Sequence, residues 1–181
     1  VLPSRPALLQ YRNKRADALR RRDEARALKA LCDTVGVPLI VNDDWRLALE
    51  IGAAGAHLGE SDGDPAQARR AAPGLLLGAS CYDDLDRARA AKAAGASYLA
   101  FGAFFPTTTK VTTRFASVAL LTAAAGLGLP RVAIGGLTPD NAGALVSAGA
   151  DLVAVVGAVF DAPAPLTAAR RFTALFDPAA D

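Results

Sequence analysis

Short apolar runs alternate along the chain with longer, alanine-rich stretches of helical period. The apolar runs have the length of buried strands, and the stretches between them suit helices of about 10 to 18 residues. This alternation is typical of repeated strand–helix units. The seven predicted strands span residues 7–10, 38–41, 55–58, 75–79, 98–101, 131–134 and 152–156.

The first predicted helix lies within residues 16–36, which read ADALRRRDEARALKALCDTVG. Helical spacing places an apolar face on this segment, and Gly36 follows it as a C-terminal glycine. The residues expected to face the core are Leu19, Ala27, Leu28, Leu31 and Val35.

Seven strand–helix units predict an α/β fold, and parallel strands joined by helices close most often as an eight-stranded (β/α)8 TIM barrel. We therefore expect one barrel domain over residues 1–181, with a first strand and helix that are missing from this chain and would precede Val1. An open doubly wound sheet is the alternative. Polar residues after nearly every predicted strand favour the barrel, because a barrel gathers all its strand ends around one mouth.

Composition changes this picture little. The 181 residues are 52% hydrophobic and 21% charged, with a net charge of +2, as in a soluble globular protein. No apolar run reaches the roughly 18 residues of a membrane span, and no signal peptide opens the chain. Dispersed basic residues give no support for a nucleic-acid partner, and the run 20–22 beside acidic neighbours predicts a solvated helix face. Cys32 and Cys81 are expected to be unpaired thiols, which favours the cytoplasm.

The first strand runs into Gln10-Tyr11-Arg12-Asn13-Lys14. In an extended segment Gln10, Arg12 and Lys14 lie on one side, and Tyr11 and Asn13 on the other. Two cations and an amide on one side could hold a di- or triphosphate. An ordinary solvated loop is the alternative.

Asp43 and Asp62 follow consecutive strands, so both carboxylates could reach one site at the barrel mouth. Two carboxylates beside a cationic phosphate site suggest Mg²⁺, with water and phosphate oxygens completing its coordination. Aspartates at 43 or 44 and at 62 or 64 also have the position of helix N-caps, and this alternative stays open.

Glycines end the last two predicted strands at Gly135-Gly136 and at Gly157. Many barrels hold a phosphate on backbone N–H groups at these strands, although glycines also occur simply in tight turns. His57, the single histidine, lies in a strand-like apolar run and is expected to be a packed core residue. A Ser-His-Asp hydrolase is therefore not expected.

Seven segments carry a resemblance to a known family: QYRNK at 10–14, VNDD at 41–44, HLGESD at 57–62, GAS at 78–80, PTTTK at 106–110, AIGGLTPDN at 133–141 and AGADLVAVVGAVF at 148–160. In order and over nearly the whole chain, they resemble the thiamine-phosphate synthase family. The resemblance implies a (β/α)8 barrel and an enzyme, a transferase of thiamine biosynthesis. Such an enzyme joins a hydroxymethylpyrimidine diphosphate to a hydroxyethylthiazole phosphate, forming thiamine phosphate and releasing pyrophosphate.

The resemblance also implies roles for individual residues. Asp43 and Asp62 would hold Mg²⁺ as the cofactor. The catalytic candidates are Arg12, Lys14, Ser80 and Lys110. Further substrate-binding candidates are Gln10, Tyr11, Asn13, Asn42, Thr107, Thr108, Thr109, Gly136, Val156 and Gly157, of which Thr107 to Thr109, Gly136, Val156 and Gly157 belong to the thiazole phosphate side.

Two residues depart from the family pattern. Glu60 stands where the family commonly has glutamine, and Gly157 stands where it often has serine, although a backbone N–H survives the second change.

Two alternative functions stay open: a thiazole tautomerase with the same barrel, and a non-catalytic barrel that binds thiamine precursors. The expected partners are small phosphorylated substrates, without nucleic acid or membrane, and a homo-oligomer is left open.

Overall fold

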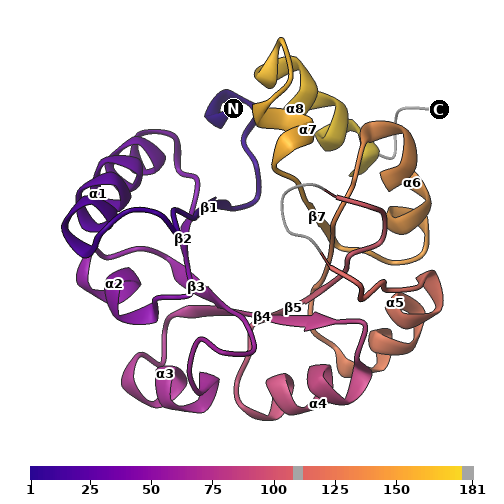
Figure 1. Ribbon diagram of the computed structural model, residues 1–181, viewed down its shortest axis with the longest axis horizontal. Coiled ribbons are helices and arrows are strands. Elements are labelled where there is room, and N and C mark those ends of the chain that lie inside the picture. The colour runs from indigo at the N-terminus through magenta and orange to yellow at the C-terminus, as the bar shows by residue number, and fades with distance from the viewer. Residues whose placement is uncertain (108–111, 177–181) are drawn as a thin grey trace.

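The computed structural model of the chain describes residues 1–107 and 112–176. In that part of the chain seven parallel strands form one sheet, and each strand pairs with the next one along the sequence. Figure 1 shows the sheet curled around a central axis with the helices on its outer side. The strands are Leu9–Tyr11 (β1), Leu39–Asn42 (β2), Gly55–Leu58 (β3), Leu76–Tyr82 (β4), Tyr98–Phe101 (β5), Arg131–Ile134 (β6) and Leu152–Ala154 (β7).

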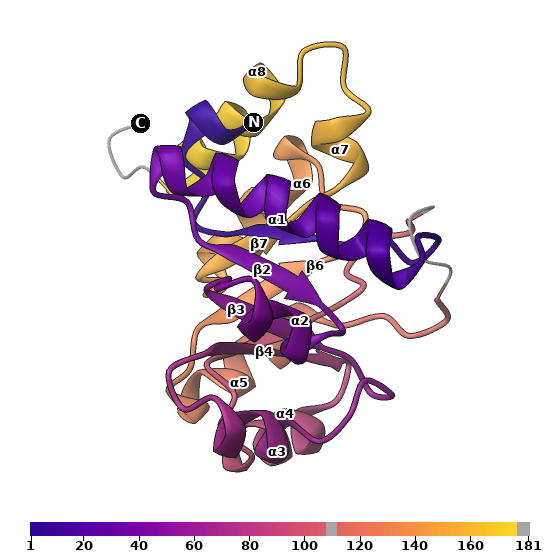
Figure 2. The same ribbon diagram turned by 90° about the vertical axis from the view of Figure 1, so that its left-hand side faces the viewer.

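Helices follow the strands and return the chain to the start of the next strand, which makes every pair parallel. Figure 2 shows these helices from the side. The α-helices are Ala18–Val35 (α1), Trp45–Glu50 (α2), Pro65–Ala71 (α3), Leu85–Ala93 (α4), Val118–Ala124 (α5), Pro139–Ser147 (α6), Gly157–Phe160 (α7) and Pro165–Thr173 (α8). Short 3₁₀ turns span Leu2–Ser4 (η1), Ala125–Leu127 (η2) and Ala174–Phe176 (η3).

The curled sheet has β1 and β7 as its two edges within the described residues. The turn η1 lies against both α8 and α1, so the start of the chain lies between the first and last helices (Figure 1). The architecture is an α/β fold of TIM-barrel type, as the sequence predicts, and the carboxyl ends of all seven strands open at one end.

Alternate strand residues pack outward against the helices. Leu39, Leu58 and Leu77 lie in one outer cluster beneath α1 to α3, and Leu99 and Phe101 lie in a second one beneath α4 to α6. All five are almost completely buried. These two outer clusters supply most of the apolar burial that holds the fold together.

The inner side of the sheet is filled by Tyr98, Ala100 and Val132, with Leu8 and Leu152 packed against them. Gly78 makes room for this packing, because a Cβ on Gly78 would lie 2.1 Å from Cζ of Tyr98. The lumen is therefore a packed layer, and the Tyr98 ring reaches across it toward β3.

The predicted core face of α1 is confirmed at Leu28 and wrong at Leu19, Ala27, Leu31 and Val35. Leu19 and Leu31 are 70% and 55% exposed, whereas Ala25 and Cys32 are fully buried and Leu28 packs beside them. Positions 25, 28 and 32 form their own helical stripe, and its small residues let the helix approach the sheet closely. The predicted face differs from the buried one because the spacing of Leu19, Ala27, Leu31 and Val35 left Ala25 and Cys32 out of the core face.

The predictions of three strands, of the end of α1 and of unpaired cysteines are confirmed. The strands at 55–58, 98–101 and 131–134 have the predicted bounds. Gly36 ends α1 in the left-handed conformation with φ of 69°, and both cysteines are free and buried. In residues 1–107 and 112–176, we find no helix with the length and apolar character needed to span a membrane.

Candidate active site

The end of β1 separates its side chains into two sets, as the alternation predicts. Tyr11 is buried under α1 and Gln10 is exposed. Lys14 Nζ lies 2.7 Å from Oδ2 of Asp43 at the mouth, and Arg12 is close enough to lower the pKa of that carboxyl. The structure thus places Arg12 and Lys14 beside Asp43.

Tyr11 and Asn13 face the other way, toward α1. The Tyr11 hydroxyl and the Asn13 amide donate to Glu24 Oε2 at 2.9 and 2.8 Å. Arg20 donates to Glu24 Oε1 at 2.7 Å. Hydrogen bonds from Arg20, Asn13 and Tyr11 lower the pKa of Glu24 to about 2. Tyr11 and Asn13 are therefore held against the helix and not grouped with Arg12 and Lys14, and their predicted substrate contacts stay a prediction.

Two aspartates follow β2 and two follow β3, and in each pair one residue caps the next helix. Asp44 Oδ1 accepts from the backbone N–H of Leu47 at 2.9 Å and caps α2. Asp64 Oδ1 accepts from Ala66 N–H at 2.9 Å and caps α3. Because Asp44 and Asp64 cap the two helices, Asp43 and Asp62 do not serve as caps and their carboxyl groups lie at the mouth.

Asp43 and Asp62 lie side by side. Asp43 has a left-handed backbone with φ of 67°, and its N–H donates to the carbonyl of His57 at 2.8 Å. Asp62 Oδ2 accepts from Gly59 N–H at 2.8 Å. Burial and the hydrogen bond shared with Asp43 raise the pKa of Asp62. Burial also acts on Asp43, but hydrogen bonds from Lys14 and Asp62 outweigh it and lower the pKa of that carboxyl.

This carboxyl pair fits a hard divalent cation. Two carboxyl groups at such close range repel each other when both are ionised, and a cation between them removes the repulsion. Mg²⁺ is commonly held by one or two protein carboxylates, and water and phosphate oxygens supply its other ligands. In the described residues no cluster of three or more His, Cys, Asp or Glu side chains forms a complete metal cage.

His57 lies directly below this pair on β3 and is 9% exposed. Its Nδ1 is 3.1 Å from the Tyr98 hydroxyl, and its Nε2 is 2.9 Å from Oγ of Ser80. Burial lowers the pKa of His57 to about 4, so the ring is neutral at physiological pH. The prediction of a packed histidine is confirmed. The ring also fixes the Ser80 hydroxyl at the floor of the mouth.

The opposite side of the mouth is formed by backbone. Gly135 and Gly136 end β6 with φ of 100° and 64°, and a Cβ on Gly136 would lie 2.3 Å from the carbonyl oxygen of Pro106. Phe105 N–H donates to the carbonyl of Gly135 at 3.1 Å. The loop that leads to Thr107 therefore lies directly against this turn. Val156 and Gly157 begin α7 after β7.

Thr107 is partly buried in this loop. Thr108, Thr109 and Lys110, which the sequence analysis assigns to the site, lie outside the described residues.

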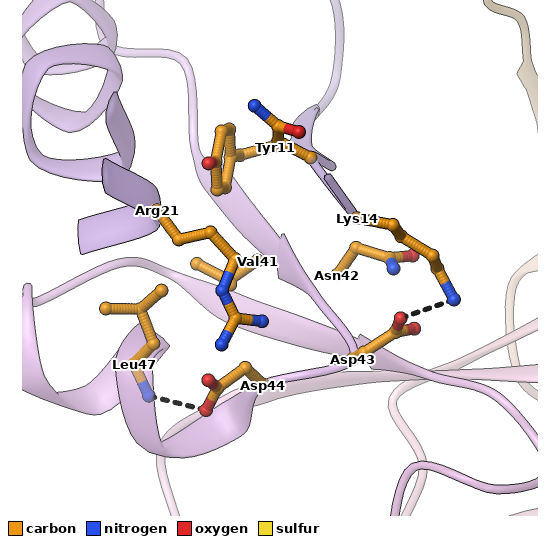
Figure 3. A pocket seen from close by; sticks show the side chains of 9 residues that line it. Tyr11, Lys14, Arg21, Val41, Asn42, Asp43, Asp44 and Leu47 are labelled. Atoms are coloured by element: carbon orange, nitrogen blue, oxygen red, sulfur yellow. Dashed lines mark hydrogen bonds and ion pairs between the residues drawn. The ribbon is translucent and has the colours of Figure 1, made fainter. Parts of the chain in front are cut away.

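A pocket beside β1 and β2 includes two residues that sequence reasoning missed (Figure 3). Arg21 reaches into it from α1, and Leu47 lines it from α2. Arg21 sits in a run of three arginines beside acidic residues, a pattern typical of a solvated helix, so no sequence signal marked it. The pocket is lined by Tyr11, Asn13, Lys14, Arg21, Val41, Asn42, Asp43, Asp44 and Leu47.

A curled parallel sheet with basic, acidic and hydroxyl groups at its strand ends is the arrangement of a TIM-barrel-type enzyme. The family model described as thiamine monophosphate synthase matches residues 1–159. The chain belongs to this family.

Known relatives agree with the assignment. The chain is 58% identical over 179 residues to thiamine-phosphate synthase of Xanthomonas campestris pv. campestris (strain 8004), covering 97% of this chain and 86% of the relative. It is 57% identical over 178 residues to thiamine-phosphate synthase of Azoarcus sp. (strain BH72), covering 97% and 86%. Among solved structures, thiamine phosphate pyrophosphorylase from Pyrococcus furiosus superposes with a TM-score of 0.86 at 31% identity, covering 93% of this chain and 82% of that one.

Proposed function

We propose that this chain is a transferase that forms thiamine phosphate from hydroxymethylpyrimidine diphosphate and hydroxyethylthiazole phosphate, with release of pyrophosphate. Family membership and the identity to thiamine-phosphate synthases support the reaction. The observation that carries the site is the pairing of Asp43 with Asp62 beside Lys14, while Asp44 and Asp64 cap helices.

In this proposal the first half of the mouth takes the pyrimidine diphosphate. Gln10, Arg12, Lys14 and Asn42 bind it, and Asp43 and Asp62 hold Mg²⁺. When bound, Mg²⁺ supplies positive charge that offsets the charge of the diphosphate. The second half takes the thiazole phosphate through Thr107, Thr108, Thr109, Gly136 and the backbone at Val156 and Gly157.

The bond between the pyrimidine methylene carbon and the diphosphate oxygen breaks, and pyrophosphate leaves with the electron pair. The amino-pyrimidine ring stabilises the resulting cation, and the thiazole nitrogen supplies the pair for the new carbon–nitrogen bond. Arg12, Lys14 and Lys110 stabilise the leaving group electrostatically, and Ser80 contributes its fixed hydroxyl. The site needs no protein nucleophile, but it has to keep water from the cation.

A complete barrel would shield that cation. We therefore also propose that an eighth strand and its helix, expected from the sequence ahead of Val1, fit between β7 and β1. The position of these two strands at the sheet edges supports the proposal, as do the exposed Leu31 and Val35 on α1. A form of the protein that carries such a segment is expected to melt at a higher temperature than residues 1–181.

The reaction is tested by incubating the protein with both substrates and Mg²⁺ and measuring thiamine phosphate and pyrophosphate together. We expect equal amounts of the two products, and neither when a substrate or Mg²⁺ is omitted. Pyrophosphate release that needs neither the thiazole phosphate nor the metal contradicts the synthase reaction. Rearrangement of a thiazole carboxylate without any diphosphate supports a tautomerase instead.

A further inference from the structure

Three loops at the mouth meet in one group of charged and aromatic side chains, which we call the Glu60 cluster. Glu60 comes from the loop after β3, and Arg114 comes from the loop after β5. The other members are Tyr82 at the end of β4, Asp83 in the following loop and Arg87 on α4.

Glu60 bridges the two arginines. Its Oε1 is 3.1 Å from Nη1 of Arg87, and its Oε2 is 3.7 Å from Nη1 of Arg114. Both guanidinium groups also lie over the Tyr82 ring, with Cζ at 4.5 Å from the ring centroid for Arg114 and 5.4 Å for Arg87. Two cations gathered at one ring repel each other, and the negative charge of Glu60 offsets that repulsion.

Each arginine is also tied to a second point of the mouth. Arg87 Nε donates to the carbonyl of Ser80 at 2.7 Å. Arg114 Nε donates to Oδ1 of Asp83 at 2.6 Å. Glu60 thus connects the strand end that carries Ser80 with the loop that carries Arg114.

Arg114 in turn fixes the base of the loop after β5. Ala103 N–H donates to the carbonyl of Arg114 at 3.3 Å, and Ala116 N–H donates to the carbonyl of Ala103 at 2.8 Å. Because Phe105 is bonded to the Gly135 turn, the arm leading to Thr107 is held between that turn and the Glu60 cluster.

We propose that Glu60 is a positioning residue, which acts through Arg87 and Arg114 to hold residues 102–107 and 112–117 in register with Ser80 and with the loop that follows β3. This role rests on the proposed function for its effect on catalysis. The role needs a carboxylate, because a neutral amide at this position cannot offset two guanidinium charges. Glu60 is 61% exposed at its side chain, so salt should weaken the effect.

The test variant is Glu60→Gln, and the chain offers a matched control in Glu50→Gln. Glu50 also bridges two arginines, Arg22 at 2.8 Å and Arg26 at 3.0 Å, and its side chain is 40% exposed. It joins α2 to α1 in the outer layer. Both variants lose the same kind of ion pairs, but only the first one changes the Glu60 cluster.

The first measurement is amide hydrogen exchange in residues 102–107 and 112–117. We expect faster exchange in Glu60→Gln than in the wild type at low salt, with no change in Glu50→Gln, and a smaller difference at high salt. Equal exchange in wild type and Glu60→Gln overturns the positioning role, whatever reaction the chain catalyses.

The second measurement is steady-state kinetics of thiamine phosphate formation. We expect Glu60→Gln to raise KM for the thiazole phosphate by up to about five-fold, while KM for the pyrimidine diphosphate and the Glu50→Gln control stay at wild-type values. Glu60→Asp should restore part of the loss, and Glu60→Gln should add nothing in an Arg114→Gln background. Equal increases in both KM values, or the same loss in Glu50→Gln, overturn the role. A wild type that makes no thiamine phosphate refutes the proposed function instead, and the exchange measurement still decides the positioning role.

Discussion

The two halves of the mouth are built from different material. From β1 to β4 the strand ends present charged and hydroxyl side chains, among them Lys14, Asp43 and Ser80. From β6 to β7 they present mostly backbone, with Gly135 and Gly136 at positive φ and Gly157 at the start of α7. Charged groups suit a metal and a leaving group that gains charge, whereas glycines suit the close approach of a phosphate that does not react.

The two halves are also stabilised differently. In the charged half, side-chain hydrogen bonds hold the strand ends: Tyr11 and Asn13 donate to Glu24, and the Ser80 hydroxyl is bonded to His57. In the glycine half the shape depends on backbone contact between the Phe105 loop and the Gly135 turn. We therefore expect substitutions in the first half to lower activity by removing charge. In the second half they should lower it by filling space that the phosphate needs.

The largest effect should follow from breaking the carboxyl pair. Asp43→Asn and Asp62→Asn should each lower turnover at limiting Mg²⁺ by about 100-fold or more, because each removes a ligand charge. Titrating activity against Mg²⁺ concentration measures the loss. The matched controls are Asp44→Asn and Asp64→Asn, which keep a capping side chain. Wild-type activity in both Asp43→Asn and Asp62→Asn would show that the pair has a structural role and does not hold the metal.

Gly136→Ala should have the next largest effect. Its φ of 64° disfavours a side chain, and the new Cβ would collide with the Pro106 carbonyl. We expect the free energy of unfolding to fall by about 1–3 kcal/mol, together with weaker thiazole phosphate binding. Gly126→Ala is the control, since a Cβ there meets nothing within 4 Å. Chemical denaturation measures the first effect, and competitive inhibition by thiazole phosphate analogues measures the second. Unchanged binding in Gly136→Ala would show that this turn does not contact the phosphate.

Glu24→Gln should have a moderate effect confined to the charged half. The hydrogen bonds from Tyr11 and Asn13 to this side chain, which brace the end of β1, become weaker. KM for the pyrimidine diphosphate should therefore rise by about three-fold, with the thiazole phosphate KM unchanged. The pKa of Glu24 is lowered, so its stabilisation is complete above the ordinary value of 4.5 and is lost as pH falls toward 2. Acid unfolding of Glu24→Gln should accordingly depend less on pH in that window. An unchanged acid profile would show that the brace does not stabilise the fold.

Gly157→Ala should have the smallest effect. A Cβ there meets only the end of the flexible Asp161 side chain, at 2.9 Å, and the backbone N–H is kept. We expect KM for the thiazole phosphate to change by less than about three-fold. A large increase measured in the same assay would mean that the phosphate needs the space of the missing side chain as well as the N–H.

The sequence predicts the strands well where a run is short, apolar and buried on both faces, as at Gly55–Leu58 and Tyr98–Phe101. From the residues alone, the sequence cannot decide which of Asp43 and Asp44 caps the helix and which faces the mouth, because the two side chains are chemically identical. In the structure, the left-handed backbone at Asp43 points its side chain away from that of Asp44. The Glu60 cluster also escapes sequence reasoning, since Glu60, Arg87 and Arg114 are far apart in the chain and meet only through the curl of the sheet.

The packed layer formed by Tyr98, Val132 and Leu152 limits the routes by which substrates and products can enter and leave the site. Once the proposed eighth strand closes the gap between β7 and β1, a lumen filled in this way offers no through-passage, so two substrates arrive and two products depart by the same opening. Under the proposed reaction, the order of departure then controls when the next pair can enter. Pyrophosphate retained by the charged half would block arrivals even after thiamine phosphate has gone, and Tyr98 and Gly78 would thereby influence turnover without touching either product.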